Sequence, residues 1–215
     1  MLCTATGRFV IVDNPIVLGG TFDPVHHAHI VIGNMASRTF AGAPVRMLLA
    51  ARPHLRKGTP APLEDRWHML QLACEQEPAL VADDTEIRLT GKVSSIDTVE
   101  ALGGRRERPV IWILGDDAAI KLPRWIGYER LTQAISIFVY QRTNEDLTSL
   151  ATDFIPSNSA LGLCIEAGQM FVSSQPVLDI SASAIRCKAR QRIPIEHDLH
   201  PDVYAHIMNN HFYQA

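Results

Sequence analysis

The sequence lacks the features that mark several large classes of protein. Nowhere in its 215 residues does an apolar stretch approach the roughly 18 residues needed to cross a bilayer, so we expect no membrane span. The four cysteines are scattered without a C-x-x-C pair, which argues against a disulfide framework or structural zinc and favours a reducing, cytoplasmic location. The net charge is −3, so we expect no general nucleic-acid binding and a local pocket for any anionic ligand.

What the chain does contain is enough apolar sequence for a packed core. Hydrophobic residues make up 47% and charged residues 20% of it, which excludes a disordered chain. Residues 1–15 carry no signal-peptide pattern, and we interpret them as an N-terminal extension. We expect residues 16–215 to form a single domain, with 181–215 as its C-terminal helical part.

Apolar runs and amphipathic stretches alternate along the chain, separated by Gly and Pro. The pattern predicts strands over residues 16–18, 45–51, 80–82, 85–89, 110–114, 134–140 and 170–172. It predicts helices over residues 27–40, 64–77, 95–102, 183–192 and 200–212. Short apolar strands between helices favour an α/β fold, a Rossmann-like doubly wound parallel sheet with helices on both faces and a small C-terminal helical region. Ligands of such sheets bind at the carboxyl ends of the strands.

The segment GGTFDPVHHAHI, residues 19–30, follows the first predicted strand. Gly19 and Gly20 let backbone approach a ligand closely. His26 and His29 stand three apart at a helix start, where two imidazoles and exposed N–H groups would make a compact anion site. An isolated H-x-x-H is more often a pair of capping or surface histidines. The glycines, the Asp-Pro step and the preceding strand favour phosphate binding, and no third ligand for zinc is evident nearby.

The segment ISASAIR, residues 180–186, opens a predicted helix near the C-terminus. Ser181 or Ser183 can cap this helix. Arg186 falls in its first turn, where a cation is unfavourable against the helix dipole unless an anion offsets it. A capped surface helix with a basic face explains the segment equally well.

These segments together resemble the bacterial nicotinate-nucleotide adenylyltransferases, members of the nucleotidyltransferase superfamily with an H-x-G-H motif. The resemblance runs from Val17 through nearly the whole chain, and residues 19–29 match G-G-[ST]-F-D-P-x-H-x-G-H except at Ala28. It implies a transferase of NAD biosynthesis, a pyridine nucleotide pathway, that binds ATP. The implied catalytic residues are His26, His29 and Arg186, and the implied ATP-binding set adds Gly19, Gly20, Thr21, Phe22, Gly115, Asp117, Ser181 and Ser183.

The resemblance also implies a site for the second nucleotide, made of Ser95, Ile96, Asp97, Thr98, Trp125, Arg142, His54 and Lys57. From the residues alone, Trp125 would be a core aromatic, Asp117 and the Ser94–Asp97 pair helix caps, and residues 52–58 a solvated basic loop in which Arg56 or Lys57 could serve. Val93 and Ser94 stand where the family has Ser and Tyr. A nicotinate acceptor is therefore less firmly predicted than adenylyl transfer itself.

The function implied is transfer of AMP from ATP to nicotinate mononucleotide, with Mg²⁺ accompanying ATP and no metal held by the protein. Alternatives are an adenylyltransferase for nicotinamide mononucleotide or a phosphopantetheine-type phosphate, and a non-catalytic nucleotide-binding protein on the same fold. A metal-binding protein using His26, His29 and His54 is a more distant one. The partners expected are small molecules, with homo-oligomerisation left open.

Overall fold

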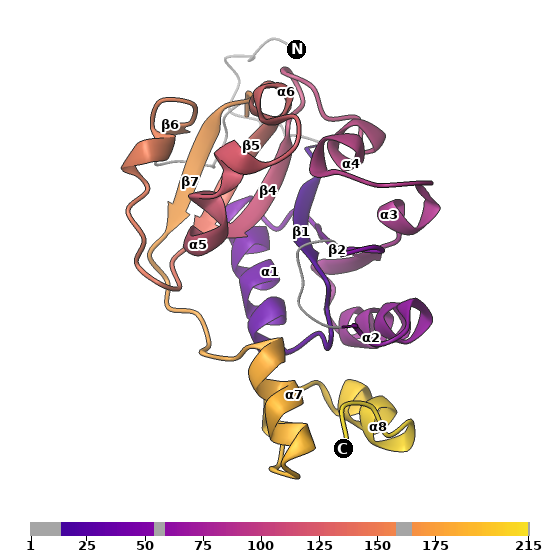
Figure 1. The fold of residues 1–215 in the computed structure, drawn as a ribbon. Helices are drawn as coiled ribbons and strands as arrows, with labels where there is room; N and C mark the ends of the chain where they lie inside the picture. Colours follow the sequence, from indigo (N-terminus) through magenta and orange to yellow (C-terminus); the bar gives the residue numbers. More distant parts are fainter. Residues whose placement is uncertain (1–13, 54–58, 158–164, 215) are drawn as a thin grey trace.

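The computed structural model describes residues 14–53, 59–157 and 165–214, and its centre is one parallel sheet (Figure 1). The strands are β1 (Ile16–Gly20), β2 (Val45–Leu49), β3 (Leu80–Asp83), β4 (Val110–Gly115), β5 (Ile135–Tyr140), β6 (Ile155–Pro156) and β7 (Gln169–Ser173). They lie in the order β3-β2-β1-β4-β5-β7-β6, and every pairing between them is parallel. The chain winds outward in both directions from β1 and β4, which confirms the predicted doubly wound α/β fold.

The strand residues alternate between two hydrophobic clusters, one on each face of the sheet. Ile16 and Leu18 of β1 belong to one cluster, and Val17 between them belongs to the other. Ile111 and Trp112 of β4 divide in the same way. Because successive side chains of a strand point to opposite faces, a nearly continuous apolar run is what a sheet covered on both sides requires.

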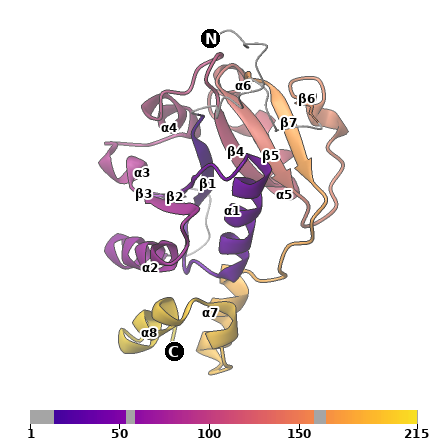
Figure 2. The ribbon, with the colours of Figure 1, turned by 180° about the vertical axis from the view of Figure 1, so that it is seen from behind.

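Helices cover both faces of this sheet. The helices of the described residues are α1 (His27–Thr39), α2 (Leu63–Glu75), α3 (Thr85–Arg88), α4 (Ser95–Ala101), α5 (Asp116–Ala119), α6 (Tyr128–Thr132), α7 (Ala182–Arg190) and α8 (Pro201–Asn209), of which α7 and α8 lie beyond one end of the sheet. The described residues also contain the 3₁₀ turns η1 (Leu122–Arg124), η2 (Thr148–Leu150) and η3 (Glu196–Asp198). Helices α5 and α6 lie in front of β4 and β5 in Figure 1, whereas α1 lies in front of the sheet when it is seen from behind in Figure 2.

One predicted strand, residues 85–89, is wrong, because Thr85–Arg88 forms the short helix α3. The Oδ1 atom of Asp83 accepts the Thr85 N–H at 2.7 Å, and this bond turns the chain out of the sheet where β3 ends. Alternating Ile87 and Leu89 favoured a strand, and the local turn at Asp83 overrides that pattern.

The last two helices lie beyond one end of the sheet in both ribbon views, at the end toward which β7 points (Figures 1 and 2). Helix α8 is joined to α2 by a contact of 3.1 Å between His206 Nε2 and Asp65 Oδ1. The carboxyl ends of the strands therefore face α7 and α8. Among the described residues, no helix is long and apolar enough to cross a membrane.

Candidate active site

The turn between β1 and α1, residues 21–26, lies at the carboxyl end of the central strand. Phe22 within it has φ +46°, a left-handed conformation that is strained for an aromatic residue, and its ring is buried. A Cβ placed on Gly20 would lie 3.0 Å from this ring. Glycine is thus needed at position 20 to make room for Phe22, a packing reason that adds to the predicted approach of a ligand.

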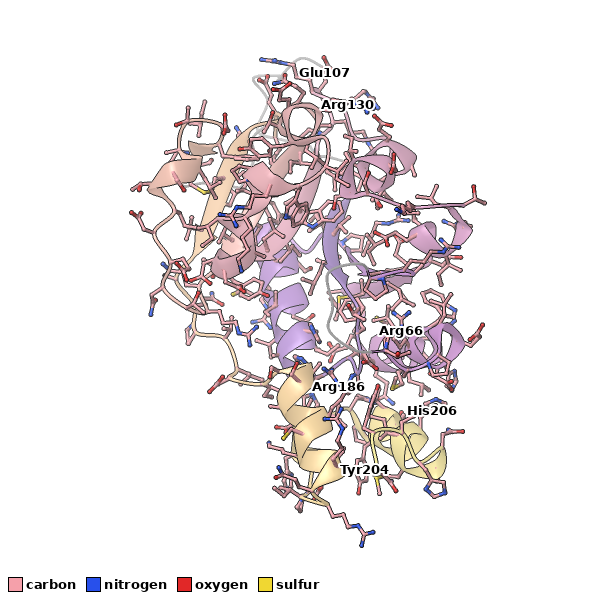
Figure 3. All side chains as sticks on the ribbon, in the orientation of Figure 1. Arg66, Glu107, Arg130, Arg186, Tyr204 and His206 are labelled. Carbon is pink, nitrogen blue, oxygen red and sulfur yellow. The ribbon has the colours of Figure 1, made fainter. Side chains whose placement is uncertain are left out.

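The buried side chain of Arg66 in α2 holds this turn in place through hydrogen bonds. The side chain of Arg66 in α2 is 2% exposed and donates hydrogen bonds to the carbonyl oxygens of Thr21, Ala50, Ala51 and Ala61 at 2.9–3.2 Å. These carbonyls lie directly after β1, directly after β2 and shortly before α2, so one guanidinium holds three segments of backbone together. Figure 3 labels Arg66 where α2 approaches the α7–α8 pair.

His26 and His29 are brought together as predicted. Their rings stack with centroids 3.7 Å apart and an interplanar angle of 27°. The His26 N–H donates to His29 Nδ1 at 3.2 Å, so the neutral His29 ring carries its proton on Nε2. The His29 N–H donates to the His26 carbonyl oxygen at 2.9 Å, and the buried Nδ1 of His26 has no hydrogen-bond partner among the described residues.

Both imidazoles are neutral at pH 7. Burial lowers the pKa of His26 to about 4, with the charges of Arg142 and His27 acting in the same direction and Asp198 opposing them. Burial, His26 and Arg142 together hold the pKa of His29 well below its usual range. The pair therefore offers hydrogen bonds rather than fixed positive charge.

Arg186 reaches this turn from the far part of the chain. Its Nη1 donates to the carbonyl oxygen of Asp23 at 2.6 Å, and its Nη2 donates to Ser183 Oγ at 3.2 Å. Ser181 is the cap of α7, accepting the Ala184 N–H at 3.2 Å. Arg186 consequently begins the second turn of the helix rather than falling in the first, so the helix dipole opposes its charge less than the sequence predicted.

Two adjacent aspartates, Asp116 and Asp117, begin α5 directly after β4 and have different surroundings. Asp117 is half-buried, and a Cβ on Gly115 would lie 2.8 Å from its Oδ1, so glycine leaves space for that carboxylate. Asp116 is fully buried, and its carboxylate accepts N–H groups from Arg142, Thr143 and Glu145 at 3.0–3.2 Å. Burial raises the pKa of Asp116, but these bonds outweigh burial and hold the pKa below its ordinary value.

The predicted residues at the start of α4 are mostly engaged in holding the helix. Asp97 accepts the N–H and the hydroxyl of Ser94 at 2.8 and 2.6 Å, which caps the helix. Ile96 is in the core, and the fully buried Thr98 donates its hydroxyl to Glu86 at 3.1 Å. Of the four, Ser95 is half-buried and has no such role among the described contacts.

Of the remaining predicted residues, the structure describes Trp125 and Arg142. Trp125 is half-buried and packs edge-to-face on Trp112 of β4, with ring centroids 6.2 Å apart. The Arg142 side chain is exposed, and its charge reaches both histidines. His54 and Lys57 lie outside the described residues.

The sequence analysis does not single out two residues that organise the site. Arg66 stands among the charged residues Glu64 and Asp65 of a predicted helix, and nothing in the sequence indicates that it is buried. Asp116 was passed over in favour of Asp117, because two adjacent aspartates carry the same sequence signal. Nothing in the sequence separates the buried aspartate that binds the loop after β5 from its half-buried neighbour.

Because one fold can host many functions, the sequence was compared with known protein families. The model of the cytidylyltransferase-like family matches residues 17–188. The chain belongs to the cytidylyltransferase-like family. The matched segment runs from β1 into α7 and contains every predicted site residue from Gly19 to Arg186.

Relatives of this cytidylyltransferase-like chain extend over almost its full length. A probable nicotinate-nucleotide adenylyltransferase of Geobacter metallireducens is 35% identical, covering 88% of this chain and 93% of its own. One of Hahella chejuensis is 32% identical, covering 94% and 97%. The solved structure of Plasmodium falciparum nicotinic acid mononucleotide adenylyltransferase complexed with NaAD superimposes with a TM-score of 0.72 at 16% identity, covering 93% and 97%, which shows the same fold.

Proposed function

We propose that this chain transfers the AMP part of ATP to nicotinate mononucleotide, giving deamido-NAD and pyrophosphate. One observation carries the proposal: His26 and His29 stack beside the β1–α1 turn, and Arg186 bonds to that same turn. The relatives named for this activity extend over most of the chain. The unit responsible is the chain from residue 16 onward, with 181–215 as its C-terminal helical part.

The reaction needs no nucleophile from the protein. An oxygen of the acceptor's 5′-phosphate attacks the α-phosphorus of ATP, a new P–O bond forms, and the bond to the bridging oxygen of the β-phosphate breaks. Pyrophosphate leaves with that oxygen. Because the acceptor phosphate is already anionic at pH 7, catalysis consists of aligning two nucleotides and stabilising the charge that moves to the leaving group.

The histidines and Arg186 form the ATP end of the site. The Nε2–H of His29 donates to an oxygen of the α-phosphate, where charge develops. His26 adds its imidazole on the same side, and an anion beside the pair raises both pKa values from their lowered positions. Arg186, with Ser183 at its side, stabilises the departing pyrophosphate. Gly19, Gly20, Thr21 and Phe22 supply the backbone against which the phosphates lie.

The acceptor lies toward β4, β5 and α4. Trp125 offers a flat face for the pyridine ring, and the backbone at Ser95 and Ile96 faces its carboxylate. Arg142 contributes positive charge between the two nucleotides, and Asp117 contacts the nucleotide at the end of β4. His54 and Lys57 are proposed to act from the loop after β2.

Mg²⁺ is proposed to arrive with ATP, where it neutralises phosphate charge and orients the triphosphate. Among the described residues, no group of three or more His, Cys, Asp or Glu could hold a metal ion. The donor set of the site, two neutral imidazoles and an arginine, suits phosphate oxygens rather than a cation. The phosphates of ATP would therefore supply the ligands of the metal. We also infer a cytoplasmic enzyme from the scattered cysteines.

The test is release of pyrophosphate from ATP and Mg²⁺ with three acceptors: nicotinate mononucleotide, nicotinamide mononucleotide and phosphopantetheine. We expect the nicotinate nucleotide to give the highest kcat/KM. A higher value with either other acceptor would reassign the substrate and keep the reaction. ATP binding without pyrophosphate release from any acceptor would refute the enzyme and support a nucleotide-binding protein.

Nicotinamide mononucleotide is the second candidate acceptor, and one observation favours it. Ser94, at a position where the resembling family carries an aromatic residue, is committed to capping α4 through Asp97. The pyridine pocket therefore has less aromatic surface on this side, and its discrimination between an amide and a carboxylate rests on the backbone of α4.

A further inference from the structure

We propose that Tyr140 is a further nucleotide-binding residue, whose hydroxyl binds a hydroxyl group of the ATP ribose together with the Asp117 carboxylate. This contact would favour ribonucleotides over deoxyribonucleotides. That the nucleotide is ATP rests on the proposed function. In the sequence, Tyr140 stands out only as the last residue of a predicted strand, and its role follows from what the fold places around it.

Tyr140 lies at the carboxyl end of the sheet. It ends β5, and its partner in the neighbouring strand is Gly115, which ends β4. The Tyr140 side chain packs against the hydrophobic cluster that contains Phe22 and Ile30. Ile30 belongs to α1, so Tyr140 lies on the face of the sheet that α1 covers in Figure 2. Helix α1 starts with the histidine pair, which therefore shares this face with Tyr140.

Two side-chain oxygens converge beside Gly115, which has no side chain of its own. A Cβ on Gly115 would lie 3.3 Å from the Tyr140 hydroxyl oxygen and 2.8 Å from Oδ1 of Asp117. The two oxygens therefore approach one point at the end of β4. Neither of them makes a hydrogen bond to another described residue. A ligand group at this point could bond to both oxygens.

The Tyr140 hydroxyl keeps its proton at pH 7. Burial raises the pKa of Tyr140, Arg142 opposes this shift, and Asp117 and Asp116 add to it. The neutral phenol can both donate and accept a hydrogen bond. Because Arg142 also acts on both histidines, Tyr140 and the histidine pair lie within reach of the same guanidinium charge.

A phenol beside a carboxylate suits an alcohol better than a phosphate. The Asp117 carboxylate accepts hydrogen bonds and repels a phosphate, whereas an alcohol can donate to Asp117 and accept from Tyr140. In ATP the alcohols are the two neighbouring hydroxyl groups of the ribose, which is joined directly to the α-phosphate. A ribose at Gly115 thus leaves the phosphates on the side of the histidine pair, and the missing side chain gives it access to the backbone.

The experiment is Tyr140→Phe, which removes the hydroxyl and keeps the ring. Calorimetry measures binding of the unreactive α,β-methylene analogue of ATP and of its 2′-deoxy and 3′-deoxy forms. We expect the variant to bind the ribonucleotide about threefold to tenfold more weakly, the effect of one lost hydrogen bond between uncharged groups. The deoxy form that lacks the contacted hydroxyl should bind equally well to the variant and the wild type.

Tyr204→Phe is the matched control, because Tyr204 lies in α8 and its hydroxyl makes no hydrogen bond to another described residue. This variant should bind all three analogues as the wild type does. Equal losses with the three analogues in Tyr140→Phe would overturn the ribose assignment, and unchanged binding of all three would overturn the contact itself. Thermal melting sets an assay temperature at which every variant is folded.

A double-mutant cycle tests whether Tyr140 and Asp117 bind the same group. If they share one ribose hydroxyl, Tyr140→Phe and Asp117→Ala together should weaken ribonucleotide binding by less than the product of their separate factors. Factors that multiply fully would show two separate contacts and would overturn the shared site.

Analogue binding needs no turnover, so it distinguishes this proposal from the proposed function. If the wild type binds the analogues but releases no pyrophosphate from ATP with any acceptor, the proposed function fails. The comparison of the deoxy forms would then still decide the role of Tyr140. If the wild type is active and Tyr140→Phe binds every analogue as the wild type does, only the role of Tyr140 is overturned.

Discussion

The N–H of Arg142 donates a hydrogen bond to Oδ1 of Asp116 at 3.1 Å, although 26 residues separate them. The Thr143 and Glu145 N–H groups join it, so the Asp116 carboxylate fixes the loop after β5 to the end of β4. The position of the Arg142 charge beside the two histidines thus depends on a carboxylate that faces away from solvent.

We expect Asp116→Asn to lower the free energy of unfolding by about 3 kcal/mol, because an amide N–H₂ would face backbone donors in a buried site. Urea denaturation measures this loss. The matched control is Asp146→Asn, which alters an exposed aspartate that bonds the Thr148 N–H and hydroxyl and should cost less than about 1 kcal/mol. Equal losses in the two variants would contradict the assigned role of Asp116.

Replacing His29 tests the ATP end of the site. We expect His29→Ala to reduce kcat by a factor on the order of 10²–10³, because one donor to the developing charge is removed. The assay is pyrophosphate release at saturating ATP and acceptor. His197→Ala serves as control, since its side chain is 91% exposed. Near-normal turnover of His29→Ala would show that this imidazole does not act on the reacting phosphate.

The lowered pKa of His26 predicts a pH-dependent stability. An unfolded histidine titrates near about 6.5, whereas burial lowers the pKa of His26 to about 4 in the folded chain. Between these values the unfolded state binds more protons, so the free energy of unfolding falls as the pH falls, by up to about 3 kcal/mol for His26. His29 acts in the same direction.

Urea denaturation at several pH values between these limits checks this expectation. His26→Gln, which cannot take up the proton, should show a shallower decline than the wild type. His197→Gln should decline as the wild type does, because that ring is exposed. Identical pH profiles for wild type and His26→Gln would refute a neutral, buried His26.

Gly20 tests the packing of the β1–α1 turn. A Cβ at this position would lie 3.0 Å from the Phe22 ring, which is 2% exposed and has little room to move. We expect Gly20→Ala to cost about 1–3 kcal/mol in stability. Gly19→Ala is the comparison, because its Cβ would lie 3.5 Å from Trp112, an ordinary contact. Thermal melting of the two variants should rank Gly20→Ala as the less stable.

The parts of this protein that could be predicted from sequence are those that depend on residues close together in the chain. Apolar runs such as residues 110–114 predicted the buried strands, because a sheet covered on both faces needs them. The histidine pair and its glycines stand within one short segment, so their proximity follows from the turn alone.

The parts that could not be predicted depend on contacts between distant segments. Asp116 and Asp117 differ only in what surrounds them, and the residues that surround Asp116 come from the loop after β5. Tyr213 contacts Asp23 across 190 residues, and a terminal tyrosine carries no signal of its own. Helix α3 was not predicted, because the hydrogen bond from the Thr85 N–H to the Asp83 carboxylate outweighs the alternation of Ile87 and Leu89.

The hydrogen bond between Arg186 and Asp23 spans 163 residues, so the proposed binding site is formed by two distant portions of the chain. A bound triphosphate that contacts both portions would stabilise their association. Hydrogen exchange in α7 should slow when the nucleotide is present, while exchange in the central strands changes little. Bound substrate would then reduce local unfolding of this protein where its two portions meet.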